Sequence, residues 1–436
     1  MDRLQRLVNG QKTGRPLGMY SVCSANPYVL EACMQNAKRK NSTLLIEATS
    51  NQVNQFGGYT GLTPGKFAMW IKTMSERCDL DWDRITLGGD HLGPTPWQAK
   101  SSDVAMKLSE ELIYGYAAAG FQKIHLDASM RLGDEVDSSG LDKRIVASRT
   151  ARLALQAEKA IKDHNIKKTP YYVIGSDVPI AGGMLDQEEL IAISDVDDVK
   201  ETLEETRKAF YAVGLVEAWE RVIALVVRTG VEFGDQSIFR YQSKKTKELS
   251  SFIKDQPGII YEAHSTDYQT ADDLRQMVCD HFAILKVGPA LTFAFREAIF
   301  SLAFIEDELC NLRKVKSRSD IVEVLDRAMK EDPSFWEKYY KGDESQLRFA
   351  RKFSLSDRSR YYWTKPQVAE ALQLLLNNLS EQDDIPWSLV DQFFPCRDLS
   401  FRSGRKYDLP KLLISKSIDK VVNDYSYACG EGMTLK

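Results

Sequence analysis

Residues 85–94 read Ile85-Thr86-Leu87-Gly88-Gly89-Asp90-His91-Leu92-Gly93-Pro94, and the interpretation of the whole chain starts from this stretch. A short apolar run, typical of a buried strand, leads directly into a polar tip. The paired glycines let the backbone pack closely, and Gly93-Pro94 turns the chain away. Asp90 and His91 together can supply a general base and a metal ligand. A helix cap beside a structural histidine is the competing interpretation.

The same arrangement recurs along the chain, where seven other short apolar runs end in polar residues and helical patterns separate them. Eight strand–helix units predict an α/β fold whose parallel sheet closes into a (β/α)8 TIM barrel. An open doubly wound sheet is the alternative, but it would more often carry a glycine-rich fingerprint after its first strand, where this chain has Ser24-Ala25-Asn26-Pro27. The expected strands are residues 19–23, 44–47, 85–87, 123–127, 171–175, 222–227, 259–264 and 282–287.

The pattern changes after about residue 305, where charged helical segments and aromatic clusters such as Tyr361-Tyr362-Trp363 replace the alternation. We therefore expect two parts. Residues 1–305 form the barrel that carries the site, and residues 306–436 form a helical extension packed on the barrel.

Composition excludes several classes of protein. Of the 436 residues, 43% are hydrophobic and 28% charged, and the formal net charge is only −4, which gives no basic surface for nucleic acid or for a membrane. The seven cysteines show no CxxC spacing, which favours reduced thiols in a cytoplasm. The polar first residues and the lack of a long apolar run predict neither a signal peptide nor a membrane span.

Barrel enzymes place their sites at the C-terminal ends of the strands, and here those ends are rich in carboxylate and imidazole. His91 and His264, from the third and seventh expected strands, are predicted metal ligands with Glu232 as the third. Helix caps, salt bridges and structural histidines are the alternatives. The polar residues at strand ends are Glu47, Asp90, His91, Asp127, Asp177, Glu232, Glu262, His264 and Lys286, of which Asp127 and Asp177 are reserve ligands.

His125 lies two residues before Asp127, so both side chains belong on the same face of a strand. A satisfied core histidine is the favoured interpretation of His125, and an inward-pointing site residue is the other.

Substrate contacts are predicted in three places. Ser265 and Thr266 follow the seventh expected strand, and Gly288 follows the eighth, where barrels commonly bind phosphate. Two ordinary turns are the alternative. The loop at residues 51–61 is dense in amides that recognise hydroxyl groups. An arginine cluster can clamp phosphate or only pack in the extension. The predicted substrate- and phosphate-binding residues are Asn51, Gln52, Asp177, Ser265, Thr266, Lys286, Gly288 and Arg358.

Long motifs across nearly the whole chain resemble the Z-subunit family of class II D-tagatose-1,6-bisphosphate aldolase. They are SVCSA at 21–25, IEATSNQVNQFGGYTG at 46–61, GGDHLGP at 88–94, KIHLDASM at 123–130, GVEF at 230–233, YEAHSTDYQT at 261–270, HFAILKVGPALTF at 281–293, SLSDR at 354–358 and RYYW at 360–363.

The resemblance implies a relative of the zinc-dependent class II aldolases. Asp90 resembles their catalytic acid/base, and His91 and His264 resemble zinc ligands. We expect Asp90, together with Glu47 or Asp127, to move protons. Glu232 stands where those aldolases have their remaining zinc histidine. The implied cofactor is a divalent metal ion, zinc foremost, with manganese, cobalt or nickel as the others. Asn26 and Asp177 depart from relatives that often have His and Glu.

The resemblance leaves three functions open. The first is metal-assisted aldolase chemistry at the C3–C4 region of a ketohexose phosphate. The second is a metal-dependent 4-epimerase that interconverts D-tagatose and D-fructose or their 6-phosphates. The third is a non-catalytic subunit that stabilises a separate catalytic class II aldolase subunit. A sugar-phosphate substrate, a homo-oligomeric assembly and a cytoplasmic location are expected.

Overall fold

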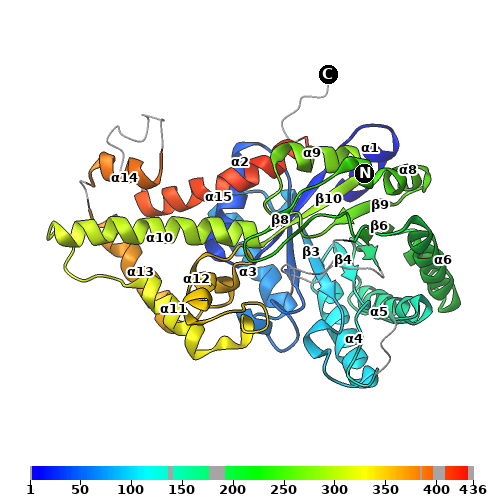
Figure 1. The fold of residues 1–436 in the computed structure, drawn as a ribbon. Coiled ribbons are helices and arrows are strands. Elements are labelled where there is room, and N and C mark those ends of the chain that lie inside the picture. The colour runs from blue at the N-terminus through cyan, green and yellow to red at the C-terminus, as the bar shows by residue number, and fades with distance from the viewer. Residues whose placement is uncertain (1, 136–140, 176–191, 383–384, 396–407, 431–436) are drawn as a thin grey trace.

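A computed structural model describes residues 2–135, 141–175, 192–382, 385–395 and 408–430 (Figure 1). Eight parallel strands close into one barrel in the order β1-β10-β9-β6-β5-β4-β3-β2, which confirms the predicted TIM barrel. A two-stranded hairpin follows β6, made of β7 (Glu232–Phe233) and β8 (Ile238–Phe239). The barrel strands are β1 (Met19–Cys23), β2 (Leu44–Thr49), β3 (Ile85–Leu92), β4 (Lys123–Leu126), β5 (Tyr171–Ile174), β6 (Val222–Val227), β9 (Ile260–Ala263) and β10 (Phe282–Val287).

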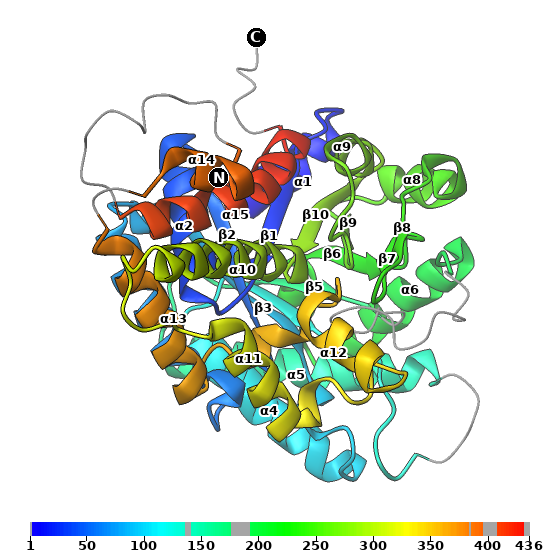
Figure 2. The same cartoon turned by 60° about the vertical axis from the view of Figure 1, so that its left-hand side comes forward.

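Helices cover the outside of the barrel and form the extension (Figures 1 and 2). The α-helices are α1 (Arg3–Lys12), α2 (Pro27–Arg39), α3 (Pro64–Arg77), α4 (Ser102–Ala118), α5 (Lys143–Asp163), α6 (Val196–Ala212), α7 (Val216–Trp219), α8 (Lys247–Asp255), α9 (Ala271–Cys279), α10 (Pro289–Asn311), α11 (Ile321–Glu331), α12 (Glu344–Phe353), α13 (Pro366–Ser380), α14 (Trp387–Phe393) and α15 (Leu409–Ala428). The 3₁₀ helices are η1 (Gly58–Thr60), η2 (Trp82–Arg84), η3 (Thr95–Trp97), η4 (Ser243–Lys245), η5 (Pro333–Phe335) and η6 (Arg358–Tyr361). No helix in the described ranges is both long and apolar enough to cross a membrane.

The interior of the barrel changes from apolar to polar along the strands. Near the start of β2 and β10, Leu45 and Ile284 point into a buried apolar cluster that α1 closes with Leu4 and Leu7. Two residues further along each strand, the same face carries Glu47 and Lys286, and β9 repeats the change from Ile260 to Glu262. The apolar layer stabilises one end of the barrel, and the polar layer lies at the C-terminal end of the strands.

β3 continues beyond the predicted polar tip and ends at Leu92. Its pairing with β4 shifts register between Gly89 and Leu92, and His91 adopts a positive φ of 45° within this irregularity. Gly88 leaves room for Glu47, because a Cβ atom at Gly88 would lie 2.6 Å from Glu47 Oε1. The bulge therefore presents Asp90 and His91 together at the mouth of the barrel.

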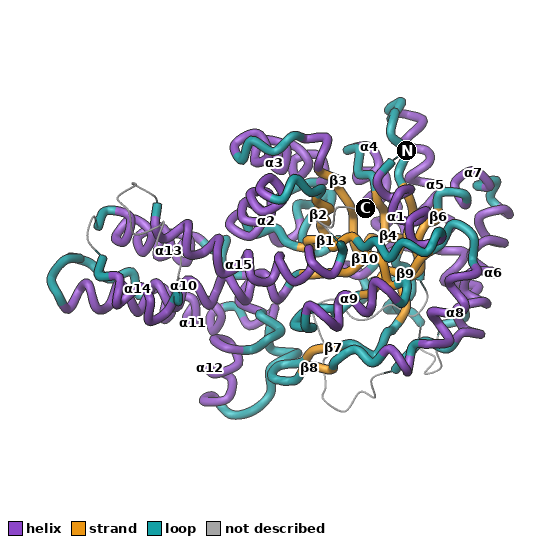
Figure 3. The backbone as a smooth tube through the Cα atoms, turned by 90° about the horizontal axis from the view of Figure 1, so that it is seen from above, coloured by secondary structure: helices purple, strands orange, loops and turns teal. Residues whose placement is uncertain are grey.

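The extension is continuous with the barrel. α10 starts directly after β10 and passes through residue 305 without a break, so the predicted boundary falls inside a helix. Figure 3 shows α10, α13 and α14 extending to one side of the barrel strands. α15 then returns and packs against α2, α9 and α10. The division into two domains stays a prediction.

Candidate functional site at the barrel mouth

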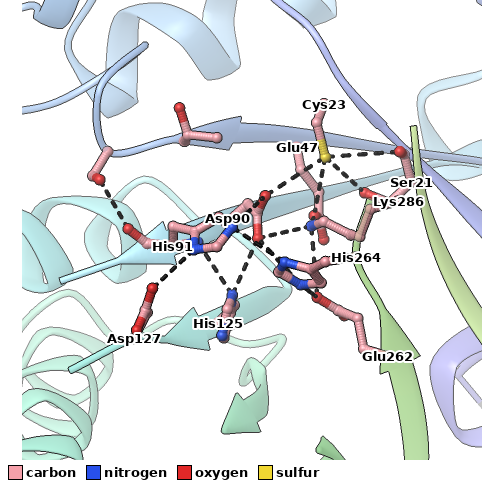
Figure 4. Close-up of polar contacts among 12 residues, drawn as sticks. Ser21, Cys23, Glu47, Asp90, His91, His125, Asp127, Glu262, His264 and Lys286 are labelled. Atoms are coloured by element: carbon pink, nitrogen blue, oxygen red, sulfur yellow. Dashed lines mark hydrogen bonds and ion pairs between the residues drawn. The ribbon is translucent and has the colours of Figure 1, made fainter. Parts of the chain in front are cut away.

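Asp90 lies at the centre of a buried polar cluster at the C-terminal end of the strands (Figure 4). Its Oδ1 atom lies 3.1 Å from His125 Nδ1 and 2.9 Å from Lys286 Nζ. Its Oδ2 atom lies 3.7 Å from the thiol of Cys23. Burial alone would raise the pKa of Asp90, but the three neighbouring histidines outweigh burial and lower it, so Asp90 is an ionised carboxylate.

The imidazoles of His91 and His264 face each other, with His91 Nε2 3.1 Å from His264 Nδ1. The outer nitrogens are held by carboxylates: His91 Nδ1 lies 2.8 Å from Asp127 Oδ2, and His264 Nε2 lies 3.0 Å from Glu262 Oε1. Because an ionised carboxylate only accepts, each outer nitrogen carries a proton. The inner nitrogens then present lone pairs to each other, which is stable when a cation lies between them.

In the metal-free protein a proton can fill this place. Burial would lower the pKa of His91, but Asp90 and Asp127 outweigh it and raise the pKa to about 9. Burial lowers the pKa of His264. These opposite directions favour protonation of His91 over protonation of His264. Carboxylate partners behind imidazole ligands are also the usual support of a metal site.

Charge in the cluster is unbalanced. Lys123 is fully buried, and its Nζ atom lies 2.6 Å from both Glu47 Oε1 and Glu262 Oε2. Lys286 contacts Glu47 and Asp90. Three carboxylates, Glu47, Glu262 and Asp90, therefore share two ammonium groups, and a fourth, Asp127, contacts only the imidazole of His91 among these cations. Burial raises the pKa of the Cys23 thiol to about 12, so this thiol adds no charge. The excess of negative charge and the paired lone pairs fit a divalent cation held by His91 and His264.

A cavity of about 130 Å³ opens above the cluster. Asp90, His91 and His264 form part of its floor. The extension covers one side, where the Arg358 guanidinium carbon lies 3.2 Å from the ring centre of Tyr339 and Tyr361 packs against Tyr59. The lining residues are Cys23, Thr49, Asn51, Gln52, Tyr59, Asp90, His91, Phe233, His264, Ser265, Asp267, Lys286, Val287, Gly288, Pro289, Tyr339, Arg358, Arg360 and Tyr361.

Several predicted site residues meet at this cavity, and others act from behind it. Asn51, Gln52, Ser265, Lys286, Gly288 and Arg358 line it with Asp90, His91 and His264. Glu47 and Asp127 do not line it; they contact Lys286 and His91 respectively. Both are therefore placed to position other groups. Asp177 lies outside the described residues.

Thr266 is oriented differently from the expectation of a phosphate ligand. Its hydroxyl donates to the carbonyl of Lys286 at 2.6 Å and lies 3.0 Å from the hydroxyl of Tyr425 on α15. The side chain is fully buried and ties two elements together.

Neither Glu232 nor His91 belongs to the groups of candidate ligand atoms that the fold brings together among the described residues. Among the described residues, the groups of three or more with atoms within 4.8 Å of one another are Asp90, His125, Glu262 and His264, and Cys23, Glu47 and Asp90. Burial raises the pKa of Glu232 to about 7, which suits a group that exchanges protons at neutral pH. Its role as third metal ligand stays a prediction.

Sequence reasoning missed Lys123 and assigned His125 to the core. His125 is indeed fully buried, yet its ring also lies 5.2 Å from the rings of both His91 and His264. The sequence carried a signal for both residues. Lys123, His125 and Asp127 alternate with Ile124 and Leu126, which places Lys123 and His125 on the inner face of β4 and Asp127 directly after the strand. Asp267 was also missed as a cavity residue, whereas Tyr59 of the loop at 51–61 and Arg360 of the arginine cluster line the cavity.

Comparisons with known proteins agree with this architecture. Residues 4–430 match the family described as D-tagatose-1,6-bisphosphate aldolase subunit GatZ/KbaZ-like. The crystal structure of a probable tagatose 6 phosphate kinase from Sinorhizobium meliloti 1021 is similar at a TM-score of 0.83 and 40% identity, covering 94% of this chain and all of that one.

Two aldolases are more distant. The YdjI aldolase from Escherichia coli K12 has a TM-score of 0.42 and 11% identity over 85% of this chain and 96% of its own. The fructose-bisphosphate aldolase from Campylobacter jejuni has a TM-score of 0.44 and 11% identity over 90% of this chain and 94% of its own. Neither value carries an argument about activity. The match over nearly the whole chain and the 40% identical structure show the family: this chain belongs to the D-tagatose-1,6-bisphosphate aldolase subunit GatZ/KbaZ-like family.

Proposed function

We propose that this chain is a metal-dependent enzyme that acts at the C3–C4 bond of a ketohexose or its phosphate. The observation that carries the proposal is the Asp90 carboxylate beside the facing nitrogens of His91 and His264 on the floor of one cavity. A protein without a working site would gain nothing from so many buried charges, since each charge is costly to desolvate.

His91 and His264, with Glu232 as the predicted third ligand, would hold the cation. A divalent cation bound there supplies Lewis-acid polarisation of a carbonyl or hydroxyl oxygen. Asp127 and Glu262 hold the two rings in the required orientation from behind.

Asp90 is the group placed to move the proton. In retro-aldol cleavage it accepts the proton of the C4 hydroxyl, the C3–C4 bond breaks, and the electron pair passes to the C2 carbonyl oxygen. Lys286 lines the same cavity and presents positive charge to that oxygen. If the aldehyde turns over, the enediolate carbon C3 attacks its opposite face, the C3–C4 bond re-forms, and Asp90 returns the proton to the C4 oxygen of the epimer. If the enediolate is instead protonated at C3 and the two fragments are released, the reaction is that of an aldolase.

Product analysis on the purified chain tests the proposal. The substrates are D-fructose, D-fructose 6-phosphate, D-tagatose 6-phosphate and D-tagatose 1,6-bisphosphate, each with added divalent metal and with chelator. Metal-dependent formation of the C4 epimer identifies an epimerase, and triose phosphates identify an aldolase. An Asp90→Asn variant that turns over as fast as wild type would refute the assignment of Asp90.

A non-catalytic subunit is the second candidate, and the word subunit in the family's description favours it. If this second candidate is right, the purified chain shows no turnover under any condition. A catalytic class II aldolase subunit gains activity or stability when this chain is added to it. An Asp90→Asn variant would then support that partner as well as wild type does. The homo-oligomer and the cytoplasmic location stay predictions.

A further inference from the structure

The amino end of α10 lies after the last barrel strand, where barrels commonly bind phosphate, and Gly288 and Pro289 at this end line the cavity. In this chain two backbone N–H groups at this end already have a partner. Asp267 Oδ1 accepts hydrogen bonds from the N–H of Gly288 at 3.0 Å and from the N–H of Ala290 at 2.8 Å. Asp267 is 3% exposed and lines the cavity beside Gly288 and Pro289.

A carboxylate in this position acts on an incoming phosphate in two ways. It occupies the donors that a phosphate oxygen would need, because one acceptor already receives both bonds. It also places a negative charge beside a second one in a site of low dielectric, which is unfavourable. Burial raises the pKa of Asp267 to about 6, with the two backbone donors and Arg360 working against burial, so the group is largely ionised at neutral pH.

The same carboxylate favours a different group. The second oxygen, Oδ2, takes no part in the two backbone bonds. A hydroxyl group of a sugar can donate to a carboxylate oxygen, whereas a phosphate dianion has no proton to donate. A free hydroxymethyl end of a ketose therefore suits this part of the cavity.

We infer that Asp267 determines the substrate specificity of the cavity by excluding a phosphoryl group from the α10 end and accepting a hydroxyl group there. The substrate class is then a ketose that is unphosphorylated at this end, and a ketose bisphosphate is selected against. The inference rests on the proposed function for the nature of the substrate, but the exclusion of phosphate is a property of the residue itself.

The test uses the full-length, metal-loaded chain with inorganic phosphate as the probe, measured by isothermal titration calorimetry. Asp267→Ser removes the carboxylate and frees the two N–H groups, and we expect phosphate to bind at least roughly tenfold more tightly than to wild type. Asp267→Asn removes the charge but keeps an oxygen on the same donors, so its affinity should rise clearly less than that of Asp267→Ser. Asp195→Ser is the matched control, because Asp195 also caps a helix, accepting from the N–H of Asp197 at 2.7 Å.

Equal phosphate affinity in wild type and a folded Asp267→Ser protein would overturn the inference, and so would an Asp267→Asn protein that gains as much as Asp267→Ser. If Asp267→Ser does not fold, turnover kinetics decide instead. The value of kcat/KM for D-fructose 1-phosphate and for D-fructose 6-phosphate, each divided by that for D-fructose, is measured in wild type and in Asp267→Asn. Wild type should disfavour one of the two monophosphates, and equal use of both would overturn the inference. Absence of turnover with every ketose counts against the proposed function and leaves the phosphate measurement intact.

Discussion

His91 Nε2 and His264 Nδ1 lie 3.1 Å apart although the two residues are 173 positions apart in sequence and come from opposite sides of the barrel order. The other nitrogen of each ring is hydrogen-bonded to a carboxylate, which is Asp127 for His91 and Glu262 for His264. This geometry suits the two ligands of a common cation that we propose, and it makes the proposal testable without knowledge of the substrate.

The first prediction concerns metal content. Wild type should bind about one divalent ion per chain, and His91→Ala or His264→Ala should abolish that binding, because a single imidazole from the pair does not hold the ion. Elemental analysis after dialysis measures this. His164→Ala is the matched control, since His164 contacts Tyr114 on the outside of the barrel. Full metal content in His264→Ala would rule out the pair as the site.

The second prediction concerns the carboxylate behind the ligand. Asp127→Asn removes the charge that holds His91 Nδ1 and should weaken metal binding by about 10–100-fold. Competition with a chromophoric chelator gives the affinity. Asp134→Asn serves as the control, because Asp134 accepts from the N–H of Ser102 at the surface. Unchanged affinity in Asp127→Asn would mean that Asp127 only fills space.

The third prediction is a pH dependence of stability in the metal-free protein. The pKa of His91 is raised to about 9, above its value in the unfolded chain of about 6.5. The stability that this shift contributes is therefore fully present below about pH 6.5 and is lost as pH rises through about 9. Tm of chelator-treated protein should fall across this range. The decline should be smaller in His91→Gln and in metal-loaded wild type; a parallel decline in all three would contradict the assignment.

The fourth prediction concerns the buried lysine of β4. Lys123→Met leaves Glu47 and Glu262 without their shared ammonium group and should destabilise the protein by roughly 3–5 kcal/mol. Urea unfolding measures the loss, which should shrink at low pH as the carboxylates take up protons. Lys38→Met breaks an exposed pair with Asp79 and should cost less than about 1 kcal/mol. Equal losses in the two variants would show that the buried pairs add nothing.

The fold could be predicted from the sequence because each barrel strand is a short apolar run that is easily told apart from the helical patterns on either side of it. α1 escaped notice because Leu4, Leu7 and Val8 form a short stripe in a polar segment, and only the closed barrel shows what they cover. The extension was expected as helices, but no local pattern shows that α15 returns to α2.

The site was predictable in part for a geometric reason. His91, Asp90 and His264 lie at strand ends, and parallel strands bring their ends to one edge. Lys123 was missed because a fully buried lysine is rare, and only the partners from other strands explain it. Asp267 was missed because its acceptor role joins residues 21 and 23 positions apart, a link that no motif reports.

The contact between Tyr425 and Thr266 has a consequence for biosynthesis. The Tyr425 hydroxyl donates to the Thr266 carbonyl at 2.8 Å, so the loop that carries His264 and Asp267 is anchored by a helix made after every barrel strand has left the ribosome. Contacts of such long sequence separation form late and slowly. The nascent chain therefore exposes an unfinished cavity for most of its synthesis, and activity should emerge only when residues 409–428 have docked.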